Sequence, residues 1–244
     1  MTGIGKKFMV MTTYANMADD PQRRGGKQPA LELPSDAAVL LPLPEAKSLP
    51  FGREPLIEVI NSRRSLRQYA DTALTLQELA FLLWCCQGVQ QKSEKHTLRT
   101  VPSAGARHAL ESYVLINRVQ DLSPGLYRYS ALNHALLPLN ISGEIAGKLA
   151  AACLGQGMVS NSAVTLFWAA EVPRMYYRYG ERGYRYLHLD AGHACQNLCL
   201  AAEAVLCGAV PIGAYDDDAL NGLIGLDGES SFVVYAAAVG KKPV

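Results

Sequence analysis

The spacing of hydrophobic and polar residues changes along this chain, and each change predicts a different element. In "EPLIEVINSRR" the apolar residues recur at helical spacing behind Pro55, which predicts a helix running out near residue 63. The stretch "TLQELAFLLWCCQG" predicts a second helix, because Thr75 and Glu78 match a capping box and Gly88 matches a helix stop. Two helices therefore open the regular part of the chain.

Strand patterns and further helices follow. Residues 111–119 are strand-like, and the turns "DLSPG" and "ALN" divide the next residues into a β-meander. The near-continuous apolar runs 163–172 and "SFVVYAAAVG" predict buried strands. Three more helices are expected: one capped by Ser142, a long one over 184–208 that ends at Gly208, and a short one in "DDDALNGLIG". This order favours an α+β domain over a Rossmann fold, and no G-x-G-x-x-G occurs.

The first 52 residues have a different pattern. Six prolines interrupt any regular element there, yet "LELP" and "VLLPLP" are apolar. We expect an N-terminal arm over residues 1–52, laid on its own body or on a partner subunit, and a main domain over residues 53–244.

Composition narrows the function classes. The net charge is only +1, so the overall charge of the chain does not attract nucleic acid or an acidic membrane. The six cysteines form no C-x-x-C or zinc spacing and have apolar neighbours, as expected for free thiols in a reducing compartment. No apolar run matches a signal peptide or a membrane span, so a cytoplasmic location is expected.

The stretch "NSRRSLRQY" is the first candidate site. Its guanidinium groups and hydroxyl suit a phosphate or another anion, although a charged helix end has the same composition. Lys241 and Lys242 follow a predicted buried strand, and they would either complete an anion site or form a solubilising tail. The small residues of "PSAG" (102–105) and the segment "GAVPIGAYDDD" (208–218) would let backbone approach a flat ligand, or would be plain turns.

Three other readings are less favoured. "HLDAGH" does not place its histidines at i, i+4, so no metal site is predicted, and Cys195 with Cys199 fits core packing. No G-x-S-x-G elbow supports a hydrolase that uses Ser103. The aromatic run 175–186 fits either a packed stripe or the wall of a flat-ligand pocket.

In this order, "RRSLRQY", a capped helix, "PSAG", "HLDAGHACQNLCLAAEAVLCGAVPIGAYDDD" and "AVG" resemble the FMN-dependent nitroreductase superfamily. "PSAGARHALESYVLINRV" with "LSPGLYRYS" is similar to its streptolysin-type azoline dehydrogenase branch. The resemblance spans about residues 55–242 and leaves the arm outside. It implies a three-layer α/β/α sandwich with a mixed, mainly antiparallel sheet, and an intertwined homodimer with FMN at the subunit interface.

The resemblance also implies the roles of individual residues. Arg63, Ser65 and neighbouring Arg64 would hold the phosphate and ribityl chain, and Arg67 would reach the pyrimidine end of the flavin. The PSAG loop would come from the other subunit. The full set of implied FMN-binding residues is Arg63, Arg64, Ser65, Arg67, Pro102, Ser103, Ala104, Gly105, Pro211, Ile212, Gly213, Ala214, Gly240, Lys241 and Lys242.

The implied activity is hydride transfer through flavin N5, with NAD(P)H as donor and a small nitro, quinone or similar compound as acceptor. No catalytic side chain is required, and Tyr179 is a weak candidate. The azoline dehydrogenases of this family use a Lys-Tyr pair, whereas this chain has Arg178-Tyr179, and arginine does not act as a base at neutral pH. The alternatives are azoline-to-azole oxidation on a modified peptide, a non-redox flavin-binding or flavin-cleaving protein, and a plain anion-binding module.

Overall fold

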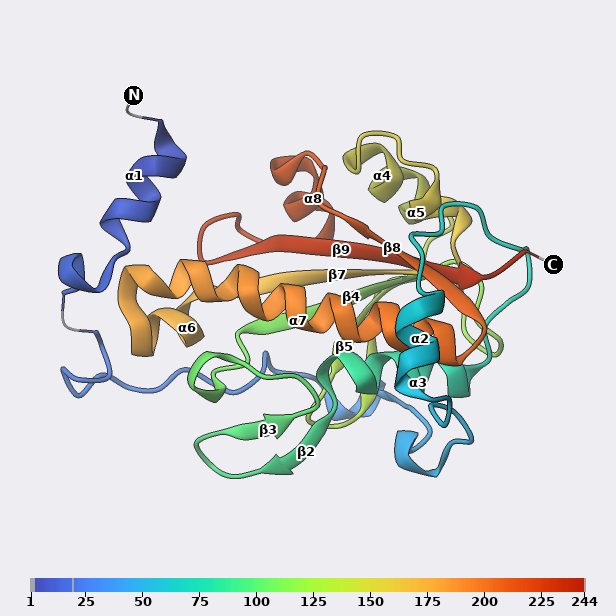
Figure 1. Ribbon diagram of the computed structural model, residues 1–244, viewed down its shortest axis with the longest axis horizontal. Coiled ribbons are helices and arrows are strands. Elements are labelled where there is room, and N and C mark those ends of the chain that lie inside the picture. The colour runs from blue at the N-terminus through green and yellow to red at the C-terminus, as the bar shows by residue number, and fades with distance from the viewer. Residues whose placement is uncertain (1–2, 19, 244) are drawn as a thin grey trace.

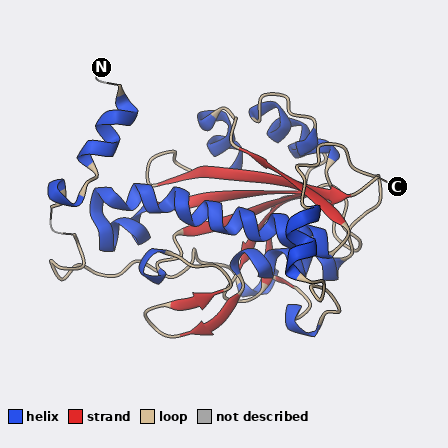
Figure 2. Ribbon diagram, viewed as in Figure 1, coloured by secondary structure: helices blue, strands red, loops and turns tan. Residues whose placement is uncertain are grey.

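A seven-stranded sheet forms the centre of the computed structural model, which describes residues 3–18 and 20–243. Figure 2 shows this sheet as the red strands at the centre of the molecule. Its strand order is β1-β6-β5-β4-β7-β9-β8, and all six neighbouring pairs are antiparallel. A separate hairpin pairs β2 with β3. The strands are β1 (Leu41–Pro42), β2 (Val89–Lys92), β3 (Thr97–Arg99), β4 (Leu110–Ile116), β5 (Gly125–Ser130), β6 (Ala135–Asn140), β7 (Val164–Glu171), β8 (Cys207–Ile212) and β9 (Ser231–Lys241).

Helices cover both faces of this sheet (Figure 1). One face carries α3 and α7, with α2 packed on α7, and the other carries α4, α5 and α8. The α-helices are α1 (Ile4–Met11), α2 (Leu56–Ser62), α3 (Leu76–Gln87), α4 (Ile145–Ala152), α5 (Met158–Asn161), α6 (Val172–Tyr179), α7 (Gly183–Ala204) and α8 (Asp217–Ile224). The expected three-layer α+β architecture is confirmed.

Strand β7 shows how the sequence builds these layers. Successive side chains of a strand point to opposite faces, so an unbroken apolar run serves two cores. Leu166 and Trp168 pack toward α3 and α7, whereas Phe167 and Ala169 pack toward α4 and α8. The prediction of a buried central strand over 163–172 is confirmed within a residue at each end. Among the described residues, no helix is both long and apolar enough to cross a bilayer.

The predicted end of the long helix is wrong. Helix α7 ends at Ala204, a turn with Leu206 at φ 55° follows, and Gly208 lies inside strand β8. A Cβ atom on Gly208 would lie 2.5 Å from Leu66, so this glycine makes room for a neighbouring segment and does not stop the helix. The segment 208–218, expected to be a loop, is therefore an edge strand as far as Ile212.

Two predicted helix ends also differ in detail. Ser142 does not cap α4, which begins after Glu144 and has no side-chain cap. Gly88 does end α3, but with an ordinary φ of −57° rather than a left-handed one. Glycine is required there because a Cβ atom would lie 2.3 Å from Trp84.

Part of the N-terminal arm lies on its own body. Strand β1 pairs with β6 and forms one edge of the sheet. Glu32 accepts hydrogen bonds from the Ser130 hydroxyl at 2.6 Å and from the Ala131 N–H at 2.7 Å. Arg128 donates to the carbonyl of Pro34 at 2.6 Å. Arg174, which is almost fully buried, donates to the carbonyl of Ala30 at 2.9 Å. Helix α1, by contrast, projects at one end of the molecule in Figure 1 and has no buried residue, although Arg185 of α7 donates to the carbonyl of Met9 and lies over the ring of Phe8.

Candidate functional site

The segment after α2 lies along the open edge of the sheet. Arg63 ends the helix, and the chain then runs beside β8, where Ser65 forms a parallel bridge with Ala209. The N–H of Leu66 donates to the carbonyl of Ala209 at 3.1 Å, and the Leu66 side chain covers Gly208. The backbone pairing and this close contact together hold the segment with the three arginines against the edge strand β8.

No described carboxylate neutralises the positive charges of this segment. Arg64, Ser65 and Arg67 are exposed, and Arg63 is half-buried. Arg64 donates only to the carbonyls of Asn61 and Arg63, both at 2.8 Å. Within the described residues, none of the three arginines forms an ion pair with a carboxylate. The segment therefore offers a hydroxyl and unpaired guanidinium groups, which together suit an anion.

The loop after β8 supplies the other end of this edge. Pro211 and Ile212 belong to the strand, and Gly213 and Ala214 follow it, exposed. Ala209, opposite Ser65, lies four residues before Gly213, which corresponds to about 13 Å along a strand. The cationic segment and the exposed loop could thus contact opposite ends of one elongated ligand.

The terminal lysines have partners inside the chain. Lys241 donates to Glu78 at 2.5 Å and to the carbonyl of Val205 at 2.9 Å, and Lys242 donates to Glu203 at 2.6 Å. Gly240 is buried under the ring of Tyr69. These contacts place the C-terminal strand beside the cationic segment, but they neutralise both lysines. Their assignment to a phosphate site stays a prediction.

The PSAG loop is fixed to the N-terminal half of α7. Ser103 donates to the Asp190 carboxylate at 2.6 Å, and the N–H of Ala104 donates to it at 3.3 Å. Burial raises the pKa of Asp190. Sequence reasoning considered Asp190 only as a metal ligand and missed this role. A carboxylate on the apolar side of a helix needs a partner, and that was the available signal.

Gly105 brings the loop against α6. Its φ is 56°, and a Cβ atom there would lie 2.5 Å from the hydroxyl of Tyr179 and 2.9 Å from Arg178 Cδ. Ala104 and Gly105 are half-buried, and Pro102 is exposed. The structure therefore brings the PSAG loop and the Arg178-Tyr179 pair together.

The two halves of the predicted site do not meet within one chain. Asp190 holds the PSAG loop, whereas Glu203 lies beside the C-terminal lysines. Thirteen residues of helix separate them, which is about 20 Å at 1.5 Å per residue. The cationic segment also lies at the C-terminal end of α7, because α2 packs there (Figure 1). The two groups of predicted site residues thus lie toward opposite ends of α7.

Comparison with known proteins identifies the family. Residues 60–241 match the model described as the Nitroreductase family. The chain belongs to the nitroreductase family. A nitroreductase-family protein of Methanocaldococcus jannaschii, MJ1384, is 35% identical over 169 residues, which make up 69% of this chain and 83% of that protein. This match confirms the resemblance inferred from the sequence.

Two other family relatives are longer than this chain. The trifolitoxin-processing protein TfxB of Rhizobium leguminosarum is 30% identical over 113 residues, covering 45% of this chain and 30% of TfxB. A crystal structure of a nitroreductase from Anabaena variabilis aligns with a TM-score of 0.66 and 30% identity, over 77% of this chain and 38% of that one. The chain therefore spans well under half of these two proteins.

Proposed function

We propose that this nitroreductase-family protein is an FMN-dependent oxidoreductase that works as a homodimer. The observation that supports this most directly is the cationic segment on the edge of the sheet. It carries unpaired guanidinium groups at one end, and exposed backbone follows β8 at the other. A flavin mononucleotide has a matching division into a phosphate end and a ring end.

The residues present fit FMN. Arg63, Ser65 and Arg64 would bind the phosphate and ribityl chain, and Arg67 would lie toward the pyrimidine ring, where a cation favours the reduced, anionic flavin. Gly213 and Ala214 would offer N–H groups to the ring edge. Since Lys241 and Lys242 are already paired with carboxylates, they would orient this edge of the sheet more than they bind phosphate directly.

A second copy of the chain would complete the site. The outer face of α7 carries Leu189, which is 58% exposed, together with exposed Gly192 and His193. If two α7 helices pack antiparallel across a two-fold axis, the N-terminal half of each lies opposite the C-terminal half of the other. The PSAG loop of one subunit would then face the cationic segment of its partner.

When bound, FMN would supply the chemistry by accepting a hydride from a nicotinamide and passing electrons to a small organic acceptor. The chain's own residues would orient the flavin and exclude water. Tyr179, whose hydroxyl lies beside Gly105, is the side chain best placed to hold or donate a proton. Arg178 would not act as a base.

Peptide modification is the second candidate. The similarity to TfxB, a toxin-processing protein by name, favours an azoline-to-azole dehydrogenase. Arginine at position 178, where that branch uses lysine, argues against it. A flavin-binding protein without redox turnover is the third reading.

The test is anaerobic reduction of the FMN-loaded protein. NADH or NADPH should reduce the flavin and bleach its absorbance, and a nitroaromatic compound or a quinone should then restore that absorbance. If the purified protein takes up no FMN, the proposal is rejected. If FMN binds but neither nicotinamide reduces it, the non-redox reading replaces the proposal.

A further inference from the structure

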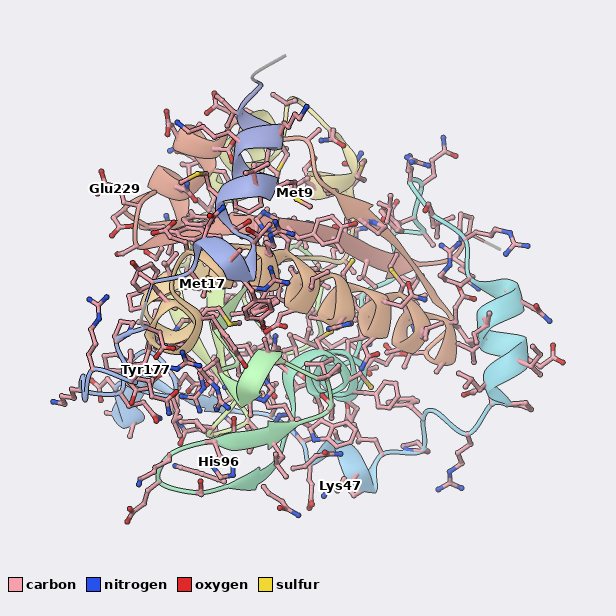
Figure 3. All side chains as sticks on the ribbon, turned by 60° about the vertical axis from the view of Figure 1, so that its left-hand side comes forward. Met9, Met17, Lys47, His96, Tyr177 and Glu229 are labelled. Atoms are coloured by element: carbon pink, nitrogen blue, oxygen red, sulfur yellow. The ribbon has the colours of Figure 1, made fainter. Side chains whose placement is uncertain are left out.

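A cavity of about 580 Å³ lies between the N-terminal arm and α6. Two residues of α6 and six of the arm line it: Arg178, Tyr179, Tyr14, Met17, Ala18, Asp20, Gln22 and Arg23. Figure 3 views this side of the molecule, where the labelled Met17 of the arm and Tyr177 of α6 lie. The volume is in the range of small-molecule sites. The arm segment lies outside the residues that match the family, so this wall belongs to the part of the chain that the family model does not cover.

The arm is held in place at both ends of this wall. Arg182 donates to the carbonyl of Thr12 at 2.9 Å and lies 4.2 Å above the ring of Tyr14. The hydroxyls of Tyr14 and Tyr186 are 3.1 Å apart. At the far end, the N–H of Gln22 donates to the carbonyl of Tyr177 at 2.8 Å. Hydrogen bonds and ring contacts therefore hold the arm segment in place as one wall of the cavity.

Among the described residues, the cavity has one arginine without an ion-pair partner, Arg178. Arg178 is exposed. Burial, and then the nearby charge of Arg178, lower the pKa of Arg107, so a second guanidinium lies close by. The carboxylate of Asp20 lies 3.4 Å from Arg23 and accepts its backbone N–H at 2.9 Å. The Asp20 carboxylate is thus engaged by Arg23.

The lining is also aromatic, and it adjoins the PSAG loop. Tyr14 of the arm and Tyr179 of α6 both line it, and the Tyr179 ring is held edge-on by Tyr186 at 4.9 Å. Arg178 and Tyr179 both contact Gly105. A ligand in this cavity would therefore lie next to the loop that the proposed function places against the flavin ring.

We propose that this cavity binds a small aromatic carboxylate, which would be the acceptor substrate where the proposed function holds. Arg178 forms a two-pronged pair with the carboxylate, and the arm segment covers the ring. The planar fork of arginine matches a carboxylate better than lysine does. The replacement of the family's lysine by Arg178 thus exchanges a proton-transfer group for an anchor. The proposal rests on the proposed function only in placing the flavin beside Gly105.

The test compares two probes on the FMN-loaded protein by calorimetry. 4-Nitrobenzoate should bind about tenfold or more tightly than its neutral analogue 4-nitrobenzamide. Arg178→Gln should remove that preference and leave the amide unaffected, and Arg178→Lys should keep part of it. Tyr14→Ala should weaken both probes. Arg24→Gln, an exposed arm arginine that does not line the cavity, is the matched control and should change neither.

Equal binding of the two probes by the native protein would overturn the proposal, as would an equal loss of both in Arg178→Gln. The Arg178→Lys variant guards against a general folding defect, since it retains the charge. FMN content and reduction by nicotinamide are measured on the same samples. Selective carboxylate binding without reduction would support this inference and reject the proposed redox function. Reduction of the flavin without selective binding of the carboxylate would support the proposed redox function and reject this inference.

Discussion

Removal of the Arg63 guanidinium should weaken FMN binding without disturbing the fold. Arg63 ends α2 through its backbone N–H, and its side chain makes no ion pair with a described carboxylate. Arg63→Ala should therefore delete the proposed phosphate contact and little else. Arg64 is a poorer choice, because its guanidinium also donates to two backbone carbonyls.

The expected magnitude follows from the chemistry of the contact. A hydrogen bond to a charged group contributes about 1.5–3 kcal/mol, which is roughly a 10- to 150-fold change in the FMN dissociation constant. Arg63 is half-buried, so salt should screen it less than it screens exposed Arg67. Ser65→Ala removes a neutral donor and should cost less, about 0.5–1.5 kcal/mol.

The assay is quenching of FMN fluorescence by apoprotein at two salt concentrations. Arg53→Ala is the matched control, because Arg53 is an exposed arginine before α2 and should leave the affinity unchanged. Thermal melting of each apoprotein checks the fold. Native FMN affinity in both Arg63→Ala and Ser65→Ala would refute the assignment of this segment to the phosphate.

Three further outcomes follow from the structure. Gly208→Ala should destabilise the protein by about 1–3 kcal/mol and weaken FMN binding, because the new Cβ displaces Leu66. Adding Leu66→Ala should restore part of the stability in urea unfolding and part of the affinity in FMN titration. Glu111→Gln should lower the melting temperature sharply, since it breaks the 2.6 Å buried pair with Arg174, a loss of about 3–5 kcal/mol, and an unchanged melt would contradict this. Burial lowers the pKa of His108 to about 3 from 6.5, so the unfolded chain takes up a proton first; stability should fall as pH drops below about 6.5, and His108→Asn should flatten that decline in unfolding curves at several pH values.

Local chemistry made some elements predictable. The capping box at the start of α3 is present as expected, with Thr75 accepting from the Glu78 N–H at 3.2 Å and Glu78 accepting from the Thr75 N–H at 2.9 Å. The end of α7 was not predictable, because Gly208 has the local signature of a helix stop. Its actual role depends on Leu66, which is 142 positions away in the sequence.

The site shows the same division. Arg63, Ser65 and the PSAG loop were recognisable from residue type, but their separation along α7 depends on tertiary structure. The pairing of Lys241 with Glu78 was not foreseen either, because it joins the last strand to the cap of an early helix. Residue types therefore indicated anion and flavin binding. Only the fold showed that the two groups of predicted site residues lie far apart within one chain.

The contacts between the arm and the sheet determine where the chain can be truncated without loss of stability. The family match begins at residue 60, which invites a shortened protein that starts there. The arm segment 30–35 supplies every acceptor that Arg128 has in the structure, namely Leu33, Pro34 and Ser35. Removing it would take these acceptors from Arg128 and open its guanidinium to water, so the packing and hydrogen bonds of this segment would be lost. We therefore expect a protein shortened to residue 60 to unfold at a lower temperature than one that keeps residues 30–59, because strand β1 and the contacts of segment 30–35 are lost with the arm.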